Sequence, residues 1–568
     1  GSGDNSSFTD STSNYTLSKG RDSTSYDYPV AGAFSPYRKG GYSVEYHGAG
    51  QHLVTENFPS GVTIGQDNYT VEFWLWRPSS QSTHDWLIMS DQGSAQLRLR
   101  VQSSGALEIY MNATSFTTST TVGANAWHHV CFTRGNSNAI TVYLDGTSIH
   151  TQTGDNTSLN STNGWKLGGH NSAQTVTEGL KIHDLRVVKG SVIVPPSGGP
   201  TEPLLPVSGT YLMAHTKPYL AYQRQTSSSD ATLVEERYNT ISGSQDNHPG
   251  TSPDTPYDHD ENSSADTGGS ISFNGDNWVE IGSPISGLSL TGDFTVEFWV
   301  YLKDPSNYKY KGLWSFHSSA NDTKFDFQGK LEIFGLSQGT LHAFTTRSWH
   351  HVAVSRTGSS IYIYINGERH STGTSQSFNA SGYAFLGRKA NGADCPFYLA
   401  DFRYTVGSCL YSAASITPPT EPLSTTANTT TLHVKGNDGA VIDKKAASEL
   451  LFKPTNGTQP TGDTTSVVYN GSTIYSGKCF KLTGATGEYI QIPNMVRLEG
   501  TEDFTVEAWV NPDYITNSYR CIFANGEVRM VIYKDGSPQR QVFSNYVPNI
   551  GWNTVSDNTN TTYSIPLD

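Results

Sequence analysis

The sequence has few cysteines, few charged residues and no long apolar run. Five Cys in 568 residues are too few and too unevenly placed for a disulfide framework, so packed sheets must supply the stability. No stretch approaches the roughly 18 consecutive apolar residues that a membrane-spanning helix needs. The formal net charge is −14 and no run of Lys and Arg occurs, so the electrostatic footprint of a nucleic-acid-binding protein is missing. We therefore expect neither nucleic acid nor membrane insertion.

Aromatic residues, glycine and small polar residues are abundant instead. Hydrophobic residues make up 35% of the chain and charged residues only 15%, with 55 Gly, 31 Tyr, 23 Phe and 11 Trp. Aromatic residues that favour strands, separated by many polar turn residues, are typical of an all-β protein. At roughly 150 residues per domain, the length predicts three or four domains.

One strand motif occurs three times. Its copies are Asn68-Tyr-Thr-Val-Glu-Phe-Trp-Leu75, Asp293-Phe-Thr-Val-Glu-Phe-Trp-Val300 and Asp503-Phe-Thr-Val-Glu-Ala-Trp-Val510. Residues alternate with period two in each copy, and both resulting faces are partly apolar. This pattern predicts a strand inside a two-sheet sandwich.

Shared segments surround the motif in a constant order. A glycine-flanked hairpin precedes each copy, at 41–54, 269–281 and 477–492. In the first two repeats, a Trp-His-His-Val segment follows, at 127–130 and 349–352, and the next strand ends in Asp145-Gly146 or Asn366-Gly367. Those dipeptides supply the positive φ angles of a tight hairpin turn. A Leu-Gly pair, an Asp-x-Arg strand and a Pro-Thr-Glu-Pro-Leu exit then close the repeat.

The exits predict three repeats, at 1–204, 205–423 and 424–568. The third is incomplete at its C-terminal end, because Trp552-Asn-Thr-Val555 is followed by only 13 residues, Ser556 to Asp568. A sandwich without its later strands would leave open edges and half a core. We expect that the chain continues or that another chain completes this sheet.

Together these motifs resemble the laminin G-like domains of the concanavalin A-like lectin/glucanase superfamily. The resemblance implies an all-β fold of tandem jelly-roll sandwiches, each with two curved antiparallel sheets. The phrases Ala33-Phe-Ser-Pro-Tyr37 and Asp401-Phe-Arg-Tyr404 further resemble tandem copies in structural and tail-fibre-like proteins of tailed bacteriophages, particularly marine cyanophages.

The superfamily includes retaining glucanases with Glu-x-Asp-x-x-Glu on one strand, which supplies nucleophile and acid. Here each Glu of the repeated strand, at positions 72, 297 and 507, is followed two residues later by Trp rather than by a carboxylate. The carboxylate pair that retention requires is thus missing from this strand. We expect no catalytic residues, and a structural hydrogen bond or a solvated strand position for these Glu side chains.

The sequence offers two possible metal sites. Adjacent residues of a strand point to opposite faces, so His128-His129 and His350-His351 cannot easily bring both rings to one ion. Laminin G-like domains often bind calcium, and the segment 258–269 spaces Asp258, Asp260, Asn262 and Asp266 as ligands of a calcium loop. Ser263 and Gly269 stand where such a loop needs Gly and Glu, so a solvated acidic loop is favoured and calcium stays an alternative. We expect no metal site and no other cofactor.

Sugar recognition needs exposed rings beside amides and carboxylates. The segment after the repeated strand differs in every repeat, and recognition usually lies in such variable loops. Its aromatic residues are the candidate ligand-binding residues: Trp86, Tyr308, Tyr310, Tyr514 and Tyr519. The alternative is that these rings pack against a neighbouring repeat or subunit.

Four functions follow from these observations. The favoured one is a non-enzymatic virion appendage or fibre protein, displayed at the virion surface or outside the cell, that adheres to host-surface glycans. Its partners would be other copies of itself, other virion proteins and host polysaccharide. The second is a purely structural filament or capsid-decoration subunit, and the third a bacterial surface adhesin. A glycan hydrolase is the least favoured, because the repeated strand lacks the carboxylate pair. The fold alone does not choose among these functions, because it hosts lectins, enzymes and spacers alike.

Overall fold

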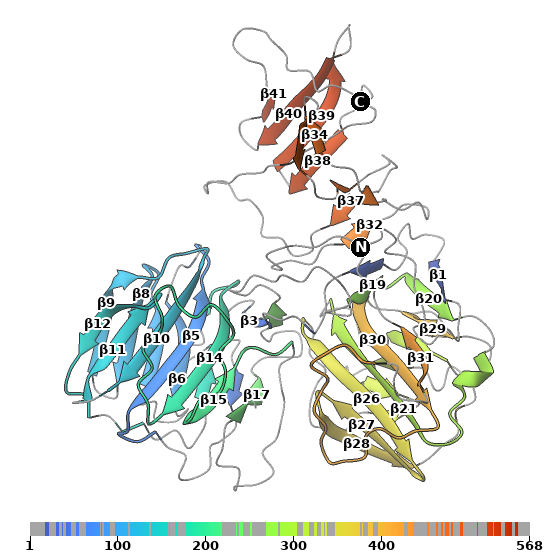
Figure 1. The fold of residues 1–568 in the computed structure, drawn as a ribbon, viewed down its shortest axis with the longest axis horizontal. Coiled ribbons are helices and arrows are strands. Elements are labelled where there is room, and N and C mark those ends of the chain that lie inside the picture. The colour runs from blue at the N-terminus through green and yellow to red at the C-terminus, as the bar shows by residue number, and fades with distance from the viewer. Residues whose placement is uncertain are drawn as a thin grey trace. The chain divides into compact units, whose positions relative to one another are not determined.

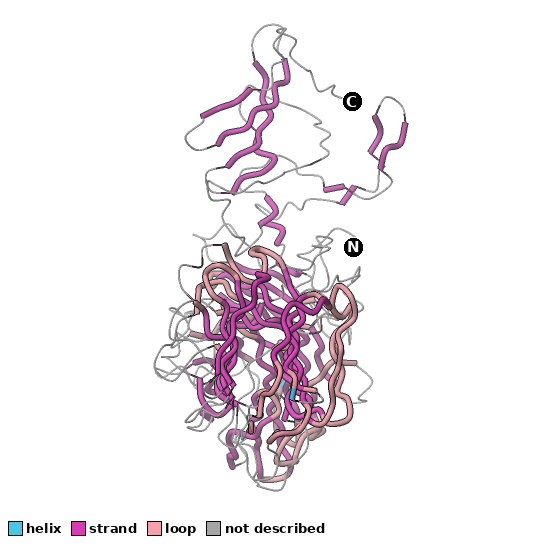
Figure 2. Tube along the Cα trace, turned by 90° about the vertical axis from the view of Figure 1, so that its left-hand side faces the viewer, coloured by secondary structure: helices cyan, strands magenta, loops and turns pink. Residues whose placement is uncertain are grey.

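The computed structural model is all-β, and a 3₁₀ turn, Ile285–Leu288, interrupts its strands (Figure 2). The structure describes residues 17–21, 30–32, 37, 41–46, 53–55, 64–79, 81, 84–90, 97–111, 114–135, 138–156, 158–159, 165–168, 176–218, 234–235, 238–241, 250–252, 269–281, 285–303, 311–316, 323–325, 331–333, 336–337, 347–374, 378, 384–389, 396–424, 430–434, 451–453, 462–463, 467–469, 472–475, 479–480, 489–491, 508, 520–525, 528–535, 540–547 and 551–554. In this part of the chain no helix is long and apolar enough to cross a membrane.

Sandwich 1 consists of two sheets, both visible in Figure 1. Sheet 1A runs β12 (Thr147–Gln152), β11 (Ile140–Leu144), β10 (Trp127–Arg134), β5 (Tyr69–Trp76), β14 (Lys181–Lys189), β15 (Thr210–Ala214) and β16 (Val234–Glu235), with β3 (Ser43–Glu45) on β14 and β18 (Gly250–Ser252) on β3. Sheet 1B runs β17 (Tyr238–Ile241), β4 (Leu53–Thr55), β13 (Trp165–Leu167), β6 (Asp85–Ser90), β7 (Leu97–Val101), β8 (Ala106–Met111) and β9 (Thr114–Thr121). Apart from the parallel pair β15 and β16, its pairings are antiparallel.

Sandwich 2 repeats this plan. Sheet 2A runs β2 (Val30–Gly32), β19 (Ser270–Asn274), β30 (Pro396–Val406), β21 (Phe294–Leu302), β26 (Trp349–Thr357), β27 (Ser360–Ile365) and β28 (Glu368–Thr374), with β31 (Thr430–Val434) on β30. Sheet 2B runs β1 (Leu17–Arg21), β20 (Asn277–Ile281), β29 (Phe385–Leu386), β22 (Gly312–Ser315), β23 (Thr323–Phe325), β24 (Leu331–Ile333) and β25 (Leu336–Ser337).

The third sequence repeat contributes smaller sheets. They pair β32 (Leu451–Lys453) with β37 (Tyr489–Gln491), β33 (Gly462–Asp463) with β36 (Cys479–Phe480), and β34 (Val467–Tyr469) with β35 (Ser472–Tyr475). A four-stranded sheet runs β38 (Arg520–Asn525), β39 (Val528–Asp535), β40 (Arg540–Val547) and β41 (Gly551–Thr554). The chain forms two compact units, one of residues 1–460 and 482–491, the other of residues 461–481 and 492–568.

Each sandwich closes over its own apolar core. In sandwich 1 the core takes Val71 and Phe73 from β5 and Leu97 and Leu99 from β7. The core of sandwich 2 is built in the same way, from strands of sheets 2A and 2B. The period-two alternation of the repeated strand therefore points one set of side chains into the core. The all-β sandwich expectation is confirmed.

The hairpin turns match the sequence expectation. Asp145 and Gly146 have φ values of 48° and 76°, and Asn366 and Gly367 have 51° and 89°. These pairs join β11 to β12 and β27 to β28. Positive φ at both positions is what the Asp-Gly and Asn-Gly dipeptides favour.

Strand pairing crosses the sequence repeats. β1 and β2 precede sandwich 1 in the chain, yet they pair with β20 and β19 of sandwich 2. Conversely, β17 and β18 precede sandwich 2 in the chain and pair with β4 and β3 of sandwich 1. The two sandwiches thus exchange edge strands within one compact unit.

Candidate functional site

The repeated Glu lies under a segment that covers the outer face of sheet 1A or 2A. We call residues 190–205 strap 1 and residues 407–424 strap 2. Glu72 and Glu297 point away from the core, yet they are 1% and 0% exposed. Neither carboxylate can reach a substrate from outside.

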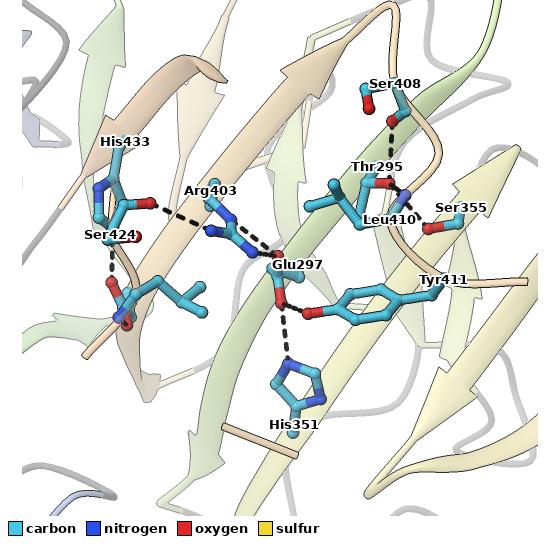
Figure 3. Close-up of polar contacts among 12 residues, drawn as sticks. Thr295, Glu297, His351, Ser355, Arg403, Ser408, Leu410, Tyr411, Ser424 and His433 are labelled. Atoms are coloured by element: carbon cyan, nitrogen blue, oxygen red, sulfur yellow. Dashed lines mark hydrogen bonds and ion pairs between the residues drawn. The ribbon is translucent and has the colours of Figure 1, made fainter. Parts of the chain in front are cut away.

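In sandwich 2 three side chains surround Glu297 (Figure 3). Arg403 donates to Oε1 from Nε at 2.8 Å and also from Nη2. The Tyr411 hydroxyl of strap 2 donates to Oε2 at 2.7 Å, and His351 Nε2 lies 3.4 Å from the same oxygen. Burial raises the pKa of Glu297, but His351, Arg403 and Tyr411 outweigh it and hold that pKa below its ordinary value. Glu297 therefore stays ionised and is not a proton donor.

Sandwich 1 repeats this arrangement with one group fewer. Arg186 donates to Glu72 Oε1 from Nε at 2.9 Å and from Nη2 at 2.6 Å, and His129 Nε2 lies 3.4 Å from Oε2. Burial raises the pKa of Glu72, but His129 and Arg186 outweigh it and keep that pKa below its ordinary value. The residue that corresponds to Tyr411 is Val194, which is 62% exposed.

The Arg and a neighbouring Asp fasten the end of each strap to the sheet. Arg186 Nη1 donates to Leu205 O at 2.6 Å, and Arg403 Nη1 donates to Ser424 O at 3.1 Å. Asp184 and Asp401 sit at bulges with φ values of 58° and 53°. Their carboxylates accept the backbone N–H of the strap residues Leu204 and Leu423. The Asp-x-Arg motif is thus an anchor for the strap.

A Thr fastens the start of each strap. Thr295 Oγ1 donates to Ser408 O at 3.1 Å and accepts the Leu410 N–H at 2.8 Å (Figure 3). Thr70 makes the same two bonds to Ser191 and Ile193, at 3.0 and 2.9 Å. We call Thr, Glu, Asp and Arg in each sandwich the strap anchor; its arrangement is structural.

The paired His residues do not converge on one ion. His129 lies beside Glu72, whereas His128 Nδ1 lies 2.7 Å from Asp145 Oδ2 at the hairpin turn. His350 likewise contacts Asn366 and Ser348, away from Glu297. Among the described residues no group of three or more His, Cys, Asp or Glu is placed to hold a metal. The acidic segment 258–266 lies outside the described residues.

An aromatic and charged patch lies on the outer face of sheet 1B. We define the sheet 1B patch as Arg98, Arg100, Gln102, Glu108 and Tyr110. The alternation of β7 buries Leu97, Leu99 and Val101 in the core and leaves both Arg residues half-buried on the other face. Cross-strand register places Arg98 opposite Tyr110 and Arg100 opposite Glu108.

Hydrogen bonds and a ring contact fix the patch. Arg100 Nε and Gln102 Nε2 each donate to Glu108 Oε2 at 2.7 Å. The Arg100 guanidinium lies 5.1 Å from the Tyr110 ring centroid, a cation–π distance. Burial raises the pKa of Glu108, but Tyr110, Gln102 and Arg100 outweigh it and hold that pKa below its ordinary value. The patch therefore presents a ring, an amide and two guanidinium groups on one partly buried surface, and the buried Glu108 carboxylate holds Arg100 and Gln102 in place.

The sequence-predicted aromatic residues fall in different places. Trp86 lies within β6 rather than in a loop, because that strand begins at Asp85. Its register partner is Arg100, so Trp86 belongs to the same transverse row of sheet 1B as Arg100 and Glu108. The other four candidates, Tyr308, Tyr310, Tyr514 and Tyr519, lie outside the described residues.

Sequence reasoning did not select the members of the sheet 1B patch. The signal was present in the Leu97-Arg-Leu-Arg-Val101 alternation, which puts both Arg side chains on one face of a strand. A search restricted to variable loops passes over such residues, because they lie in strands of the shared scaffold.

Comparison with solved structures finds distant likenesses. Domains LG4-5 of the mouse laminin alpha1 chain match at 12% identity over 68% of this chain and 96% of that chain, with a TM-score of 0.24. A heptameric SAP-like pentraxin from Limulus polyphemus matches at 16% identity over 27% of this chain and 79% of the pentraxin chain, with a TM-score of 0.23. A protein from Bacteroides ovatus matches at 14% identity, with a TM-score of 0.27. The match covers 33% of this chain and 54% of the Bacteroides protein.

Family comparison concerns the two sandwiches. No curated protein matches this chain. The family model described as the concanavalin A-like lectin/glucanases superfamily matches residues 47–192 and 273–405. These two segments contain the repeated strand, the Trp-His-His-Val strand and all the residues of both strap anchors. Residues 47–192 and 273–405 are laminin G-like domains of the concanavalin A-like lectin/glucanase superfamily.

Proposed function

We propose that this chain is a non-enzymatic adhesive protein of a tailed-bacteriophage virion, an appendage or fibre component that binds host-surface glycans. The observation that carries this proposal is the sheet 1B patch. A pyranose face stacks on a ring while its hydroxyls need directional donors and acceptors. Tyr110 offers the ring, and Arg100 on β7 and Gln102 just after it offer the polar groups, both oriented by the buried Glu108.

The buried anchors support a non-enzymatic reading. Retaining glycosidases need two carboxyl groups about 5–5.5 Å apart, one of them protonated. Glu72 and Glu297 are enclosed under the straps and each is bound to an Arg, so neither serves as the acid or the nucleophile. The superfamily includes both lectins and glucanases, and we expect this chain to act as a lectin.

Adhesion would work through multivalency. Weak sites repeated along assembled chains give avidity without one tight pocket. The proposal therefore places the protein at the virion surface or outside the cell, with other virion proteins as neighbours. It requires neither a cofactor nor calcium.

The test is binding of the full chain to an array of bacterial surface polysaccharides, including those of marine cyanobacteria. For the polysaccharide bound best, we expect Arg100→Ala to weaken affinity about tenfold or more, since a hydrogen bond to a charged group is worth about 1.5–3 kcal/mol. Trp86→Ala is expected to weaken the same interaction.

Arg369→Ala is the matched control. Arg369 lies 5.2 Å from the Tyr362 ring centroid in sandwich 2, so this variant also removes an Arg from a cation–π pair. It should leave affinity unchanged. Equal losses in both variants would exclude the sheet 1B patch as the site, and release of reducing sugar ends during incubation would contradict a non-enzymatic role.

A further inference from the structure

The edge strands of sandwich 1 come from one continuous segment. β15 pairs with β14, and further along the chain β17 and β18 pair with β4 and β3 of the same sandwich. Residues 210–252 thus supply the inner strand β15 and then the edge strands β16, β17 and β18. Sandwich 1 is closed by the segment that follows its strap.

Sandwich 2 begins to close in the same way and then departs from it. β31 pairs with β30 in the register that β15 has with β14, so that Arg403 faces His433 as Arg186 faces Met213. The next strands in the chain, β32 and β33, pair with β37 and β36 of the third repeat instead. The edges of β20 and β19 are filled by β1 and β2 from the other end of the chain.

Equivalent sheet edges are therefore filled in some repeats by the lead-in segment of another repeat and in one by the repeat's own lead-in segment. Segments that lead into a repeat pair with another repeat in the case of β1, β2, β17 and β18, and with their own repeat in the case of β32 and β33. Unpaired sheet edges are templates for any strand of matching length and alternation. Equivalent edges in the three repeats are thus filled by segments from different positions in the chain.

The donor segment contacts sandwich 2 through its side chains, while its end is also held to sandwich 1: the Tyr42 N–H donates to Thr216 O at 3.1 Å, and Tyr42 O lies 2.9 Å from His183 Nδ1. Between β2 and β3, Tyr37 packs edge-on against Trp299 with ring centroids 5.9 Å apart and donates its hydroxyl to Asp401 Oδ2 at 2.8 Å. Tyr42 accepts a hydrogen bond from Trp349 Nε1 at 3.0 Å. These side chains complete a buried aromatic cluster with Tyr301, Tyr398 and Ala400 of sheet 2A.

We propose that residues 17–42 of one copy of this chain complete sandwich 2 of a second copy, so that copies are joined by exchanged strands. All pairs of β1 with β20 and of β2 with β19, and both Tyr contacts, form equally well within one chain and between two. Exchange of identical elements therefore costs little beyond the entropy of association. This inference is independent of glycan binding, although joined copies would also multiply the proposed binding sites.

Cross-linking tests the exchange, because Ser18 and Glu280 are register partners. Cross-strand partners have Cβ atoms about 4.5–5.5 Å apart, within reach of a short bis-maleimide once both positions carry a thiol. A tagged Ser18→Cys chain and an untagged Glu280→Cys chain are co-expressed, treated with the reagent and analysed by mass spectrometry. We expect a covalent heterodimer in which the peptide containing position 18 of one chain is linked to the peptide containing position 280 of the other.

Two controls make the result decisive. The Ser18→Cys/Glu280→Cys double variant reports whether the strands pair at all, and co-expressed Ser18→Cys and Glu332→Cys chains report non-specific coupling, since Glu332 lies on β24 in another part of sheet 2B. The unmodified chain controls for its own cysteines. A link found only within single double-variant chains, no link in any sample, or equal yields with Glu332→Cys would each overturn the proposal.

Discussion

The two sandwiches hold their straps with the same four side-chain types but enclose the buried glutamate differently. In sandwich 2, Tyr411 comes down from the strap and binds Glu297. In sandwich 1, Val194 stands at that place, is exposed and makes no such bond. The comparison separates what the anchor needs, a Thr, a Glu, an Asp and an Arg, from what one sandwich adds.

The largest expected effect is the loss of the buried glutamate. Glu297→Ala leaves the Arg403 guanidinium without its partner beneath strap 2, and breaking such a buried pair costs about 3–5 kcal/mol. Chemical denaturation, monitored by hydrogen exchange in peptides from β21, measures this loss of stability. Glu72→Ala should lower the free energy of unfolding less, as read from β5 peptides, because no tyrosine loses its hydrogen-bond partner there. Equal losses would contradict the difference drawn between the sandwiches.

A buried aspartate gives sandwich 1 a pH dependence of its own. Asp85 is fully buried; Thr177 donates to Oδ1 from its N–H at 2.8 Å and from its hydroxyl at 3.0 Å. Burial, partly offset by Thr177 and Arg77, raises the pKa of Asp85 from 3.8 to about 6.

The sign follows from linkage. Between pH 3.8 and about 6 the folded state keeps a proton that the unfolded state has released, so stability falls as pH rises through this window and levels off above it. The fall is about 1.4 kcal/mol per pH unit, or up to about 3 kcal/mol in total. Hydrogen exchange of β6 peptides at about pH 4 and pH 7, corrected for intrinsic exchange rates, measures it, and Asp85→Asn should abolish the difference. A fall of the same size in sandwich 2 peptides would point to another group.

The third effect concerns the tyrosine alone. Tyr411→Phe keeps the ring over the sheet and removes one hydrogen bond to an ionised carboxylate, which is expected to cost about 1.5 kcal/mol in sandwich 2. The midpoint of denaturant unfolding, read from β21 and β30 peptides, provides the measurement. An unchanged midpoint would mean that His351 and Arg403 already satisfy Glu297.

The smallest effect is a gain. Val194→Tyr gives strap 1 the residue type that strap 2 has, and a new hydrogen bond to Glu72 Oε2 should stabilise sandwich 1 by about 1 kcal/mol. The same peptides of β5 and β14 report the change. Val194→Phe separates the contribution of the ring from that of the hydroxyl, and an equal gain in both variants would exclude the hydrogen bond.

The sequence predicted the strands better than their partners. Alternation located the strand of Val71 and Phe73, and the Asp145-Gly146 dipeptide located the hairpin of β11 and β12, because both signals are local. The sequence predicts linkers where the straps end, since proline and threonine dominate there, and only the fold brings Leu204 to Asp184. The exchange of edge strands gave no local signal, because each repeat carries a lead-in segment of the same kind. The sheet 1B patch could have been found from the alternation around Arg98 and Arg100.

The exchanged strands also bear on the order in which this chain folds during synthesis. Leu17 is made early, but its partner Ile281 lies in the second sandwich, and sandwich 1 in turn waits for Ser252 to pair with Ser43. Sandwich 1 can close once β18 has left the ribosome, whereas β1 and β2 stay unpaired until β20 and β19 of sandwich 2 have been made. Pairings so distant in sequence are slow to form and leave edges open meanwhile. On a polysome, where nascent copies are crowded together, those open edges would meet one another first.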